Sequence, residues 1–139
     1  MASEFHHRRK VGFIDTDRGG LIHYTNYFRY FEEAEVAFVG SLGLAPEDDP
    51  FRASSLPRIS VSAEFLKPVG FGDELDVHIW VAAKGRSSIT FKASFGCNGE
   101  EVARASVKAV CAEKAADGTI RSRPLPEALD RALEVRASD

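Results

Sequence analysis

The feature that most constrains the fold of this chain is a helical stretch that is apolar around most of its circumference. From residue 27 to about residue 42, apolar side chains recur with the 3.6-residue period of a helix, and Glu35 interrupts the main stripe. Polar side chains occupy only part of the remaining surface, so such a helix must be largely covered. Gly43 then suits the left-handed position that ends a helix.

The rest of the chain supplies a sheet to cover that helix. Residues 5–14 predict a first strand, and a two-residue period over 58–65 predicts a second strand with one buried face. Alternating stretches at 75–81, 89–95 and 102–112 follow, joined by short turn-like connections that favour an antiparallel meander. The side chains expected on the buried face of the second strand are Ile59, Val61, Ala63 and Phe65.

A single helix cannot bury its apolar surface alone, so we expect the sheet to curl around it. The predicted class is α+β, with one domain over residues 1–139 made of a five-stranded antiparallel sheet wrapped around one long helix, the hotdog fold. Thr25 or Asn26 is expected to cap the helix N-terminus. Residues 45–57 are expected to be loop, and the polar tail after residue 112 holds a short helix near 127–135.

Composition excludes several classes of protein. The formal net charge of −3 argues against a nucleic-acid partner. No stretch approaches the roughly 20 apolar residues of a membrane helix, and the first ten residues lack the apolar core of a signal peptide. Cys97 and Cys111 read as reduced core residues, so we expect a cytoplasmic protein. No three His, Cys or carboxylate residues stand at metal-ligand spacing, and neither a metal nor another cofactor is expected.

Chemistry is most plausible in the loop from Asp15 to Gly20, which precedes the helix. A helix N-terminus offers unpaired N–H groups that suit a developing oxyanion, and a nearby carboxylate can act as base or nucleophile on a carbonyl. The residues alone leave open that Asp15 and Asp17 merely form turns. The chain has no GxSxG, Walker or GxGxxG motif, which argues against serine hydrolases, P-loop enzymes and Rossmann oxidoreductases.

Two segments of the sequence resemble the 4-hydroxybenzoyl-CoA thioesterase family. They are FIDTDRGGLIHYTNYFRYFEEA, with its acidic pair, glycine, aliphatic pair and Asn-Tyr, and LPRISVSAEFLKPVGFGDEL. The resemblance covers most of the chain and thins out after about residue 112. It implies an acyl-CoA thioesterase in which Asp17 is the catalytic carboxylate, as nucleophile or as general base, and the backbone N–H of Tyr24 polarises the thioester carbonyl.

The resemblance also implies a set of substrate contacts. Glu32 matches a position that faces the acyl pocket in the family, and Asp15 is expected to orient the loop. Basic residues at the 83–86 turn and in the tail are expected near the coenzyme A phosphates. The expected substrate-binding residues are His23, Asn26, Tyr27, Glu32, Arg86, Arg121 and Arg123.

Assembly and two other functions complete the expectations. The edge strands lack obvious blocking residues, and the family joins two protomers into a continuous sheet, so a homodimer that assembles further to a homotetramer is expected. A hotdog hydratase or dehydratase is one alternative, but it would need a catalytic histidine where this chain has Asp17. A non-catalytic acyl-CoA-binding protein is the other. The acyl group, aryl or aliphatic, stays open.

Overall fold

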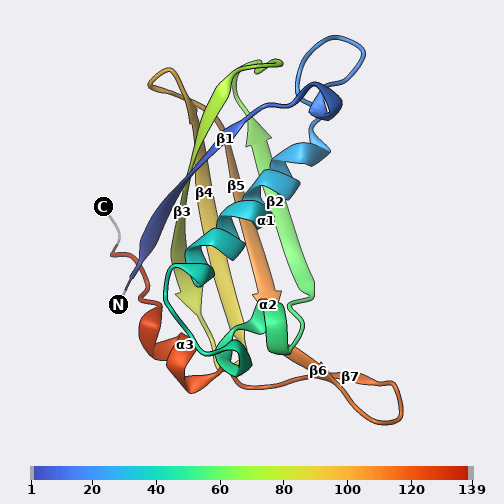
Figure 1. Ribbon diagram of the computed structural model, residues 1–139, viewed down its shortest axis with the longest axis vertical. Coiled ribbons are helices and arrows are strands. Elements are labelled where there is room, and N and C mark those ends of the chain that lie inside the picture. Colours follow the sequence, from blue (N-terminus) through green and yellow to red (C-terminus); the bar gives the residue numbers. More distant parts are fainter. Residues whose placement is uncertain (1, 138–139) are drawn as a thin grey trace.

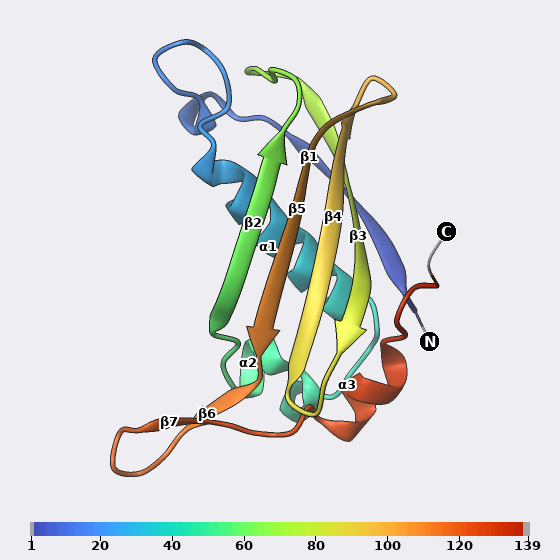
Figure 2. The ribbon, with the colours of Figure 1, turned by 180° about the vertical axis from the view of Figure 1, so that it is seen from behind.

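The chain folds as one curved antiparallel sheet that wraps around a single long helix. The structure is a computed structural model that describes residues 2–137, and the helix lies diagonally across the inner face of the sheet (Figure 1). Seen from behind, the outer face of the sheet carries no helix (Figure 2). The predicted α+β class and the helix-in-sheet arrangement are confirmed.

The elements follow one another in the order expected, with additions in the loop and the tail. In chain order they are β1 (Glu4–Lys10), the 3-10 turn η1 (Phe13–Asp15), α1 (Thr25–Gly40), the 3-10 turn η2 (Pro46–Asp48), α2 (Pro50–Ala53), β2 (Arg58–Phe65), β3 (Glu74–Lys84), β4 (Ser88–Cys97), β5 (Glu100–Val110), β6 (Ala112–Lys114), β7 (Ile120–Ser122) and α3 (Glu127–Ala132).

The five long strands lie in the order β1-β3-β4-β5-β2, and all neighbours are antiparallel. Strands β3, β4 and β5 form the predicted meander. Strand β2 does not join β3, which follows it in the chain, but pairs with β5 at the opposite edge of the sheet. This order makes β1 and β2 the two edges of the sheet. The helix starts near one end of β2 and crosses toward β3 (Figures 1 and 2).

The core lies between α1 and the inner face of the sheet. Tyr30, Phe31 and Phe38 are fully buried on the helix, and the Phe38 ring packs against Phe5 on β1 and Phe91 on β4 at centroid distances of 5.7 and 6.1 Å. Burying a side chain of this size contributes about 1.5–3 kcal/mol each to folding. The strictly alternating burial of β3 and β4 places their apolar side chains under the helix, as their two-residue period predicts.

Several predicted boundaries are wrong. The first strand ends at Lys10, four residues early, because η1 turns the chain back toward the helix. The helix begins at Thr25 with Tyr24 before it, and neither Thr25 nor Asn26 caps it with a side chain. Two short helical turns lie in the predicted 45–57 loop, and a small β6–β7 hairpin lies in the predicted irregular tail. Gly43 has the expected positive φ of 68°, two residues after the cap at Ser41.

The most informative error concerns β2, which has no buried face in the protomer. Ile59, Val61 and Phe65 keep 58%, 52% and 49% of their surface exposed, and only Ala63 of the predicted set is half-buried. The alternation of β2 was read correctly, but β2 is an edge strand that the diagonal helix does not reach along its length (Figure 1). An apolar edge strand is a ready surface for pairing with another strand.

Among the described helices, the longest has 16 residues, and none combines the length and the apolar character of a membrane span. Cys97 and Cys111 are both free, and Cys111 is buried.

Candidate active site

The loop between β1 and α1 is held by one of its two aspartates. Asp15 is 4% exposed, and its carboxylate accepts a hydrogen bond from the Tyr30 hydroxyl at 2.5 Å. Arg29 also donates to this carboxylate, and Arg9 lies 3.4 Å from it. The backbone oxygen of Asp15 accepts from the His23 N–H and from the side-chain amide of Asn26, both at 2.9 Å. These bonds fasten the loop to β1 and to the first turns of the helix.

The electrostatics of Asp15 match this anchoring role. Burial alone would raise its pKa, but the Tyr30 hydrogen bond and the positive charges of Arg29 and Arg9 outweigh burial and lower the pKa below its ordinary value. The Arg9 guanidinium also lies 4.4 Å from the Tyr30 ring centroid and donates to Glu33 at 2.7 Å. Asp15 is thus a charged, fully engaged carboxylate, as its expected orienting role requires.

Asp17 lies two residues further along the loop and is exposed. Its Oδ1 atom accepts from the backbone N–H groups of Gly19 at 2.8 Å and Leu21 at 3.3 Å, so the turn-forming interpretation of this residue holds for one oxygen. Within residues 2–137, Oδ2 receives no hydrogen bond. The loop can turn here because Gly20 adopts a φ of +82°, a conformation that side chains with a Cβ rarely take.

A hollow of about 410 Å³ opens between this loop, the helix N-terminus and the end of β2. Asp17 lies on its wall, and the side chain of Tyr24 borders it with 59% of its surface exposed. Tyr24 precedes the first helical residue, and its backbone N–H donates to no acceptor among the described residues. A free N–H at a helix N-terminus suits a negatively charged oxygen. Within residues 2–137, one hollow is therefore lined both by Asp17, which has an unbonded carboxylate oxygen, and by Tyr24, which has a free hydrogen-bond donor.

Of the other expected substrate contacts near the start of the helix, only one lines the hollow. Tyr27 lines the hollow, with its ring packed against Phe65 and Phe95 at 5.2 Å each. His23 and Asn26 do not line it: His23 bonds the Thr25 hydroxyl at 2.7 Å, and Asn26 holds the Asp15 backbone. Both side chains stabilise the loop in the protomer, and their contacts with substrate stay predictions.

Glu32 lies a turn further along the helix and does not line the hollow either. Its side chain is exposed and lies 3.5 Å from Arg58 on β2. Arg58 in turn bonds the buried Glu35 at 2.6 Å. This carboxylate pair on the helix faces the β2 edge of the protomer.

The basic residues expected at the coenzyme A phosphates lie away from Asp17. Arg86 is in the β3–β4 turn, and Arg121 and Arg123 are in and after β7. Both segments lie at the end of the molecule opposite the loop 15–20 (Figures 1 and 2). One protomer therefore does not bring these arginines to its own Asp17. Lys84 bonds the carbonyl oxygens of Asp130 and Leu133 at 2.7 and 2.6 Å and so secures α3.

Several wall residues of the hollow were not singled out from the sequence. Lys67 borders it and is paired with Glu100, and Val69 forms its buried floor. Gly70 lies in the connection between β2 and β3, which passes close to the 15–20 loop. A Cβ at Gly70 would lie 3.1 Å from the Gly20 carbonyl oxygen. The second segment of the resemblance contains this stretch, and that was the available signal. The missed lining residues are Leu21, Ile22, Phe65, Leu66, Lys67, Pro68 and Val69.

Comparisons with known proteins agree with this fold. The sequence profile of the thioesterase superfamily matches residues 19–103, which is more than half of the chain, so the protein belongs to that superfamily. It is 30% identical over 136 residues to a 1,4-dihydroxy-2-naphthoyl-CoA hydrolase of Prochlorococcus marinus (strain MIT 9313), covering 91% of this chain and 87% of the relative.

Solved structures show the same fold. The crystal structure of a hypothetical protein from Aquifex aeolicus superposes with a TM-score of 0.83 at 28% identity, covering 94% of this chain and 99% of that one. The 4-hydroxybenzoyl-CoA thioesterase of Pseudomonas sp. strain CBS-3 also superposes with a TM-score of 0.83, at 22% identity and with the same coverage. The predicted resemblance and the hotdog fold are thereby confirmed.

Proposed function

We propose that the protein is an acyl-CoA thioesterase that hydrolyses aromatic acyl-CoA thioesters in the hollow beside Asp17. The observation that carries the proposal is that one largely apolar hollow is lined by both Asp17 and Tyr24. Among the described residues, Asp17 Oδ2 accepts no hydrogen bond and the Tyr24 backbone N–H donates none. Membership of the thioesterase superfamily supports the reaction class. The aromatic preference is supported by the rings of Tyr24, Tyr27 and Phe65 on the wall, and by relatives described as hydrolases of an aromatic thioester.

The chemistry follows from those two groups. The thioester carbonyl oxygen accepts from the Tyr24 N–H, which stabilises the negative charge that develops when the carbonyl is attacked. In the base route, Asp17 takes a proton from a water molecule, the resulting hydroxide adds to the carbonyl carbon, and the C–S bond breaks. The coenzyme A thiolate then recovers the proton from Asp17, and the free acid leaves.

In the nucleophile route, Asp17 adds to the carbonyl itself and expels the thiolate. The mixed anhydride that forms is then opened by water, which regenerates the carboxylate. Both routes leave Oδ2 as the reacting atom, because Oδ1 is held by two backbone N–H groups. The two routes differ in whether the chain is acylated during turnover.

A second protomer completes the site in this proposal. The exposed apolar face of β2 supports antiparallel pairing of β2 with its copy, a two-fold arrangement that reverses the direction of the partner. The hairpin end of the partner, with Arg121 and Arg123, then lies toward the Asp17 end of the first protomer. In this arrangement the expected phosphate-binding arginines of the neighbour lie near the Asp17 site of the first protomer. Assembly to a homotetramer and a cytoplasmic location are further parts of the proposal.

The proposed activity is tested with purified protein and a panel of acyl-CoA thioesters, followed by the release of free thiol. We expect aromatic thioesters to give the highest kcat/KM, by about tenfold or more over aliphatic ones of similar size, since a matched ring buries more apolar surface against the wall. Faster turnover of aliphatic thioesters would overturn the aromatic preference. No turnover of any thioester would overturn the activity itself.

The shared site is tested by mixing two defective proteins. One carries Asp17→Asn, and the other carries Arg121→Ala together with Arg123→Ala. If the arginines serve the partner's Asp17, hybrid dimers hold one intact site, and mixing restores activity beyond the sum of the separate proteins. If mixed and exchanged proteins show only that sum, the arginines do not act across a dimer.

A further inference from the structure

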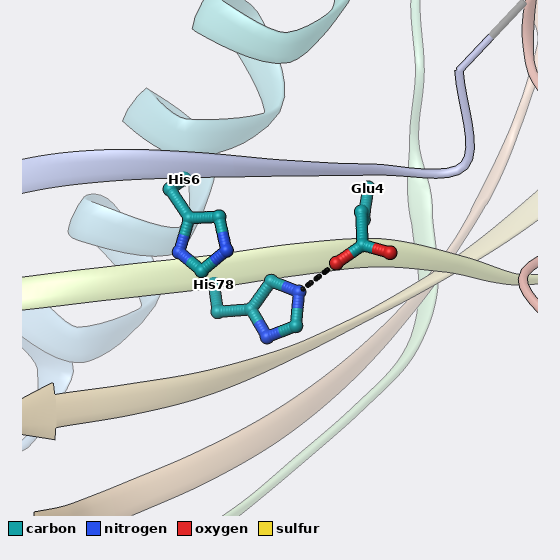
Figure 3. A group of neighbouring side chains, drawn as sticks. All are labelled: Glu4, His6 and His78. Carbon is teal, nitrogen blue, oxygen red and sulfur yellow. Dashed lines mark hydrogen bonds and ion pairs between the residues drawn. The ribbon is translucent and has the colours of Figure 1, made fainter. Parts of the chain in front are cut away.

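The outer face of the sheet carries a cluster of side chains that the proposed reaction does not use. Glu4 and His6 lie two residues apart on β1, and His78 lies on the neighbouring strand β3 (Figure 3). His6 and His78 are direct cross-strand partners in the β1–β3 register. The sequence gives no hint of this cluster, because 72 positions separate the two histidines and only the strand pairing brings them together.

The three side chains lie close enough together to share one ion. One ligand atom from each of Glu4, His6 and His78 lies within 4.8 Å of the other two. The two imidazole rings stack with their centroids 4.2 Å apart and an interplanar angle of 2°. His78 Nε2 lies 2.8 Å from a Glu4 carboxylate oxygen, so these two groups already face each other at hydrogen-bond distance.

A fourth residue orients one of the ligands. The carboxylate of Asp76 lies 2.9 Å from His6 Nδ1, while His6 Nε2 bonds nothing else in residues 2–137. A carboxylate that holds one ring nitrogen fixes the ring and leaves the lone pair of the other nitrogen for a metal. Metal-binding histidines in proteins commonly have this carboxylate partner.

The surroundings favour a cation over an anion. The cluster borders a polar hollow of about 640 Å³, and the acidic residues on its wall are Glu74, Asp76, Glu100 and Glu101. Three basic side chains near this wall are paired with its carboxylates: Arg8 with Glu74, Lys67 with Glu100, and Arg104 with Glu101. Glu4 and Asp76, by contrast, have only the two histidines as partners in the ion pairs that the described residues form.

We propose that Glu4, His6 and His78 form a binding site for a borderline divalent transition-metal ion, of the class of Zn²⁺, Ni²⁺ and Cu²⁺, that fastens the edge strand β1 to β3. Two imidazoles and one carboxylate are the donors that such ions prefer, and the Irving–Williams order places Cu²⁺ first among them. Metal–nitrogen bonds of about 2.0–2.1 Å require the two ring nitrogens to approach to about 3–3.5 Å. Small side-chain rotations on an exposed face supply that approach.

The site is separate from the proposed chemistry. It lies on the outer face of the sheet and at the β1 edge, whereas Asp17, α1 and the end of β2 enclose the hollow on the inner side (Figures 1 and 2). The bound ion therefore stabilises the fold and does not take part in thioester hydrolysis. Removing divalent ions with a chelator is expected to leave turnover unchanged.

The chain contains its own probe for this site. Trp80 is the only tryptophan, and its ring centroid lies 5.1 Å from that of His78. Titration of the tag-free protein with Cu²⁺ should therefore quench Trp80 fluorescence with a micromolar midpoint. His6→Gln and His78→Gln should each weaken the midpoint about tenfold or more, since each removes one of three ligands.

His7→Gln is the matched control, because His7 neighbours His6 on β1 but lies on the other face, 3.6 Å from Glu33. It should quench like the wild type. Equal midpoints in all four proteins, or no quenching of the wild type up to about 1 mM Cu²⁺, would overturn the site.

Thermal unfolding provides an independent readout. Zn²⁺ should raise the Tm of the wild type and of His7→Gln, because an ion that binds only the folded chain stabilises it by mass action. It should leave the Tm of a His6→Gln, His78→Gln double variant unchanged. An equal rise in the double variant would place the ion elsewhere and contradict the assignment. Unfolding in chelator confirms that the variants are folded before any ion is added.

Discussion

The two halves of the loop between β1 and α1 use the same residue type for opposite purposes. In the first half, Asp15 is buried and engaged by a tyrosine hydroxyl and two arginines. In the second half, Asp17 is exposed, with one oxygen held by backbone N–H groups and the other free. The buried carboxylate therefore builds the loop, whereas the open one keeps an oxygen free for the proposed reaction. Their spacing of two residues places them on opposite sides of one turn.

The open half also depends on a hydrogen-bond donor, and removing this donor should lower turnover strongly. Tyr24→Pro deletes the backbone N–H proposed to bind the carbonyl oxygen, and the Tyr24 φ of −55° already suits proline. We expect kcat to fall about 10²–10³-fold, the usual loss of one oxyanion donor. Tyr24→Ala keeps the N–H and is the control, with a fall of less than about tenfold. Equal losses in both variants would assign the effect to the side chain.

The buried half should respond in stability. Asp15→Asn removes the negative charge that Arg29, Arg9 and Tyr30 share, which we expect to lower the free energy of unfolding by about 1–3 kcal/mol. Because the pKa of Asp15 is lowered in the folded state, its contribution is complete above its ordinary pKa of 3.8 and is lost as the pH falls through the folded value. Denaturant unfolding from pH 7 to pH 3 measures the loss. A gap between the unfolding free energies of wild type and variant that does not narrow as the pH falls would contradict this assignment.

A third carboxylate, Glu35, is buried like Asp15 but has fewer partners to offset the effect of burial on its pKa. Glu35 is 1% exposed; desolvation raises its pKa from 4.5 to about 7, although Arg58 opposes this. Between those two pH values the Glu35 carboxyl is ionised in the unfolded state and protonated in the folded state. The free energy of unfolding of the wild type therefore falls as the pH rises from about 4.5 to 7. The pKa shifts of Asp15 and Glu35 therefore have opposite signs. Three side chains donate to or pair with Asp15, whereas Arg58 alone offsets the burial of Glu35.

Glu35→Gln removes this titration. Relative to the wild type, the free energy of unfolding of the variant should rise by about 1–3 kcal/mol between pH 5 and pH 8. Paired denaturant curves at the two pH values measure the change. A difference between variant and wild type that is independent of pH would show that Glu35 stays ionised in the folded state.

The sequence predicted the elements better than their surroundings. The helix, the alternating strands and the acidic loop were visible because periodicity and turn residues are local signals. The exposure of β2 was not visible, since alternation does not tell whether a strand lies at an edge. The loop anchor shows the same limit: Asp15 was recognised, but Arg9 and Tyr30 were not expected as its partners, because they meet only after the chain folds.

The residues expected at the candidate site lie in two places. Tyr27 lines the hollow with Asp17 and Tyr24, whereas Arg86, Arg121 and Arg123 lie at the far end of the protomer, and their contacts with substrate stay predictions. The cross-strand cluster of Glu4, His6 and His78 was missed because ligand spacing along a sequence does not report strand register. Sequence reasoning was strongest for contacts within one turn of helix or loop and weakest for contacts between distant strands.

In the proposed mechanism, the open Asp17 performs the reaction and the buried Asp15 does not. The most direct measurement is the turnover of Asp17→Asn on a thioester that the wild type hydrolyses, with unfolding measured on the same preparation. We expect kcat to fall about 10²–10⁴-fold, with KM and the unfolding midpoint little changed. An exposed carboxylate that acts on the substrate contributes little to folding. Turnover within about threefold of the wild type would contradict the proposed mechanism.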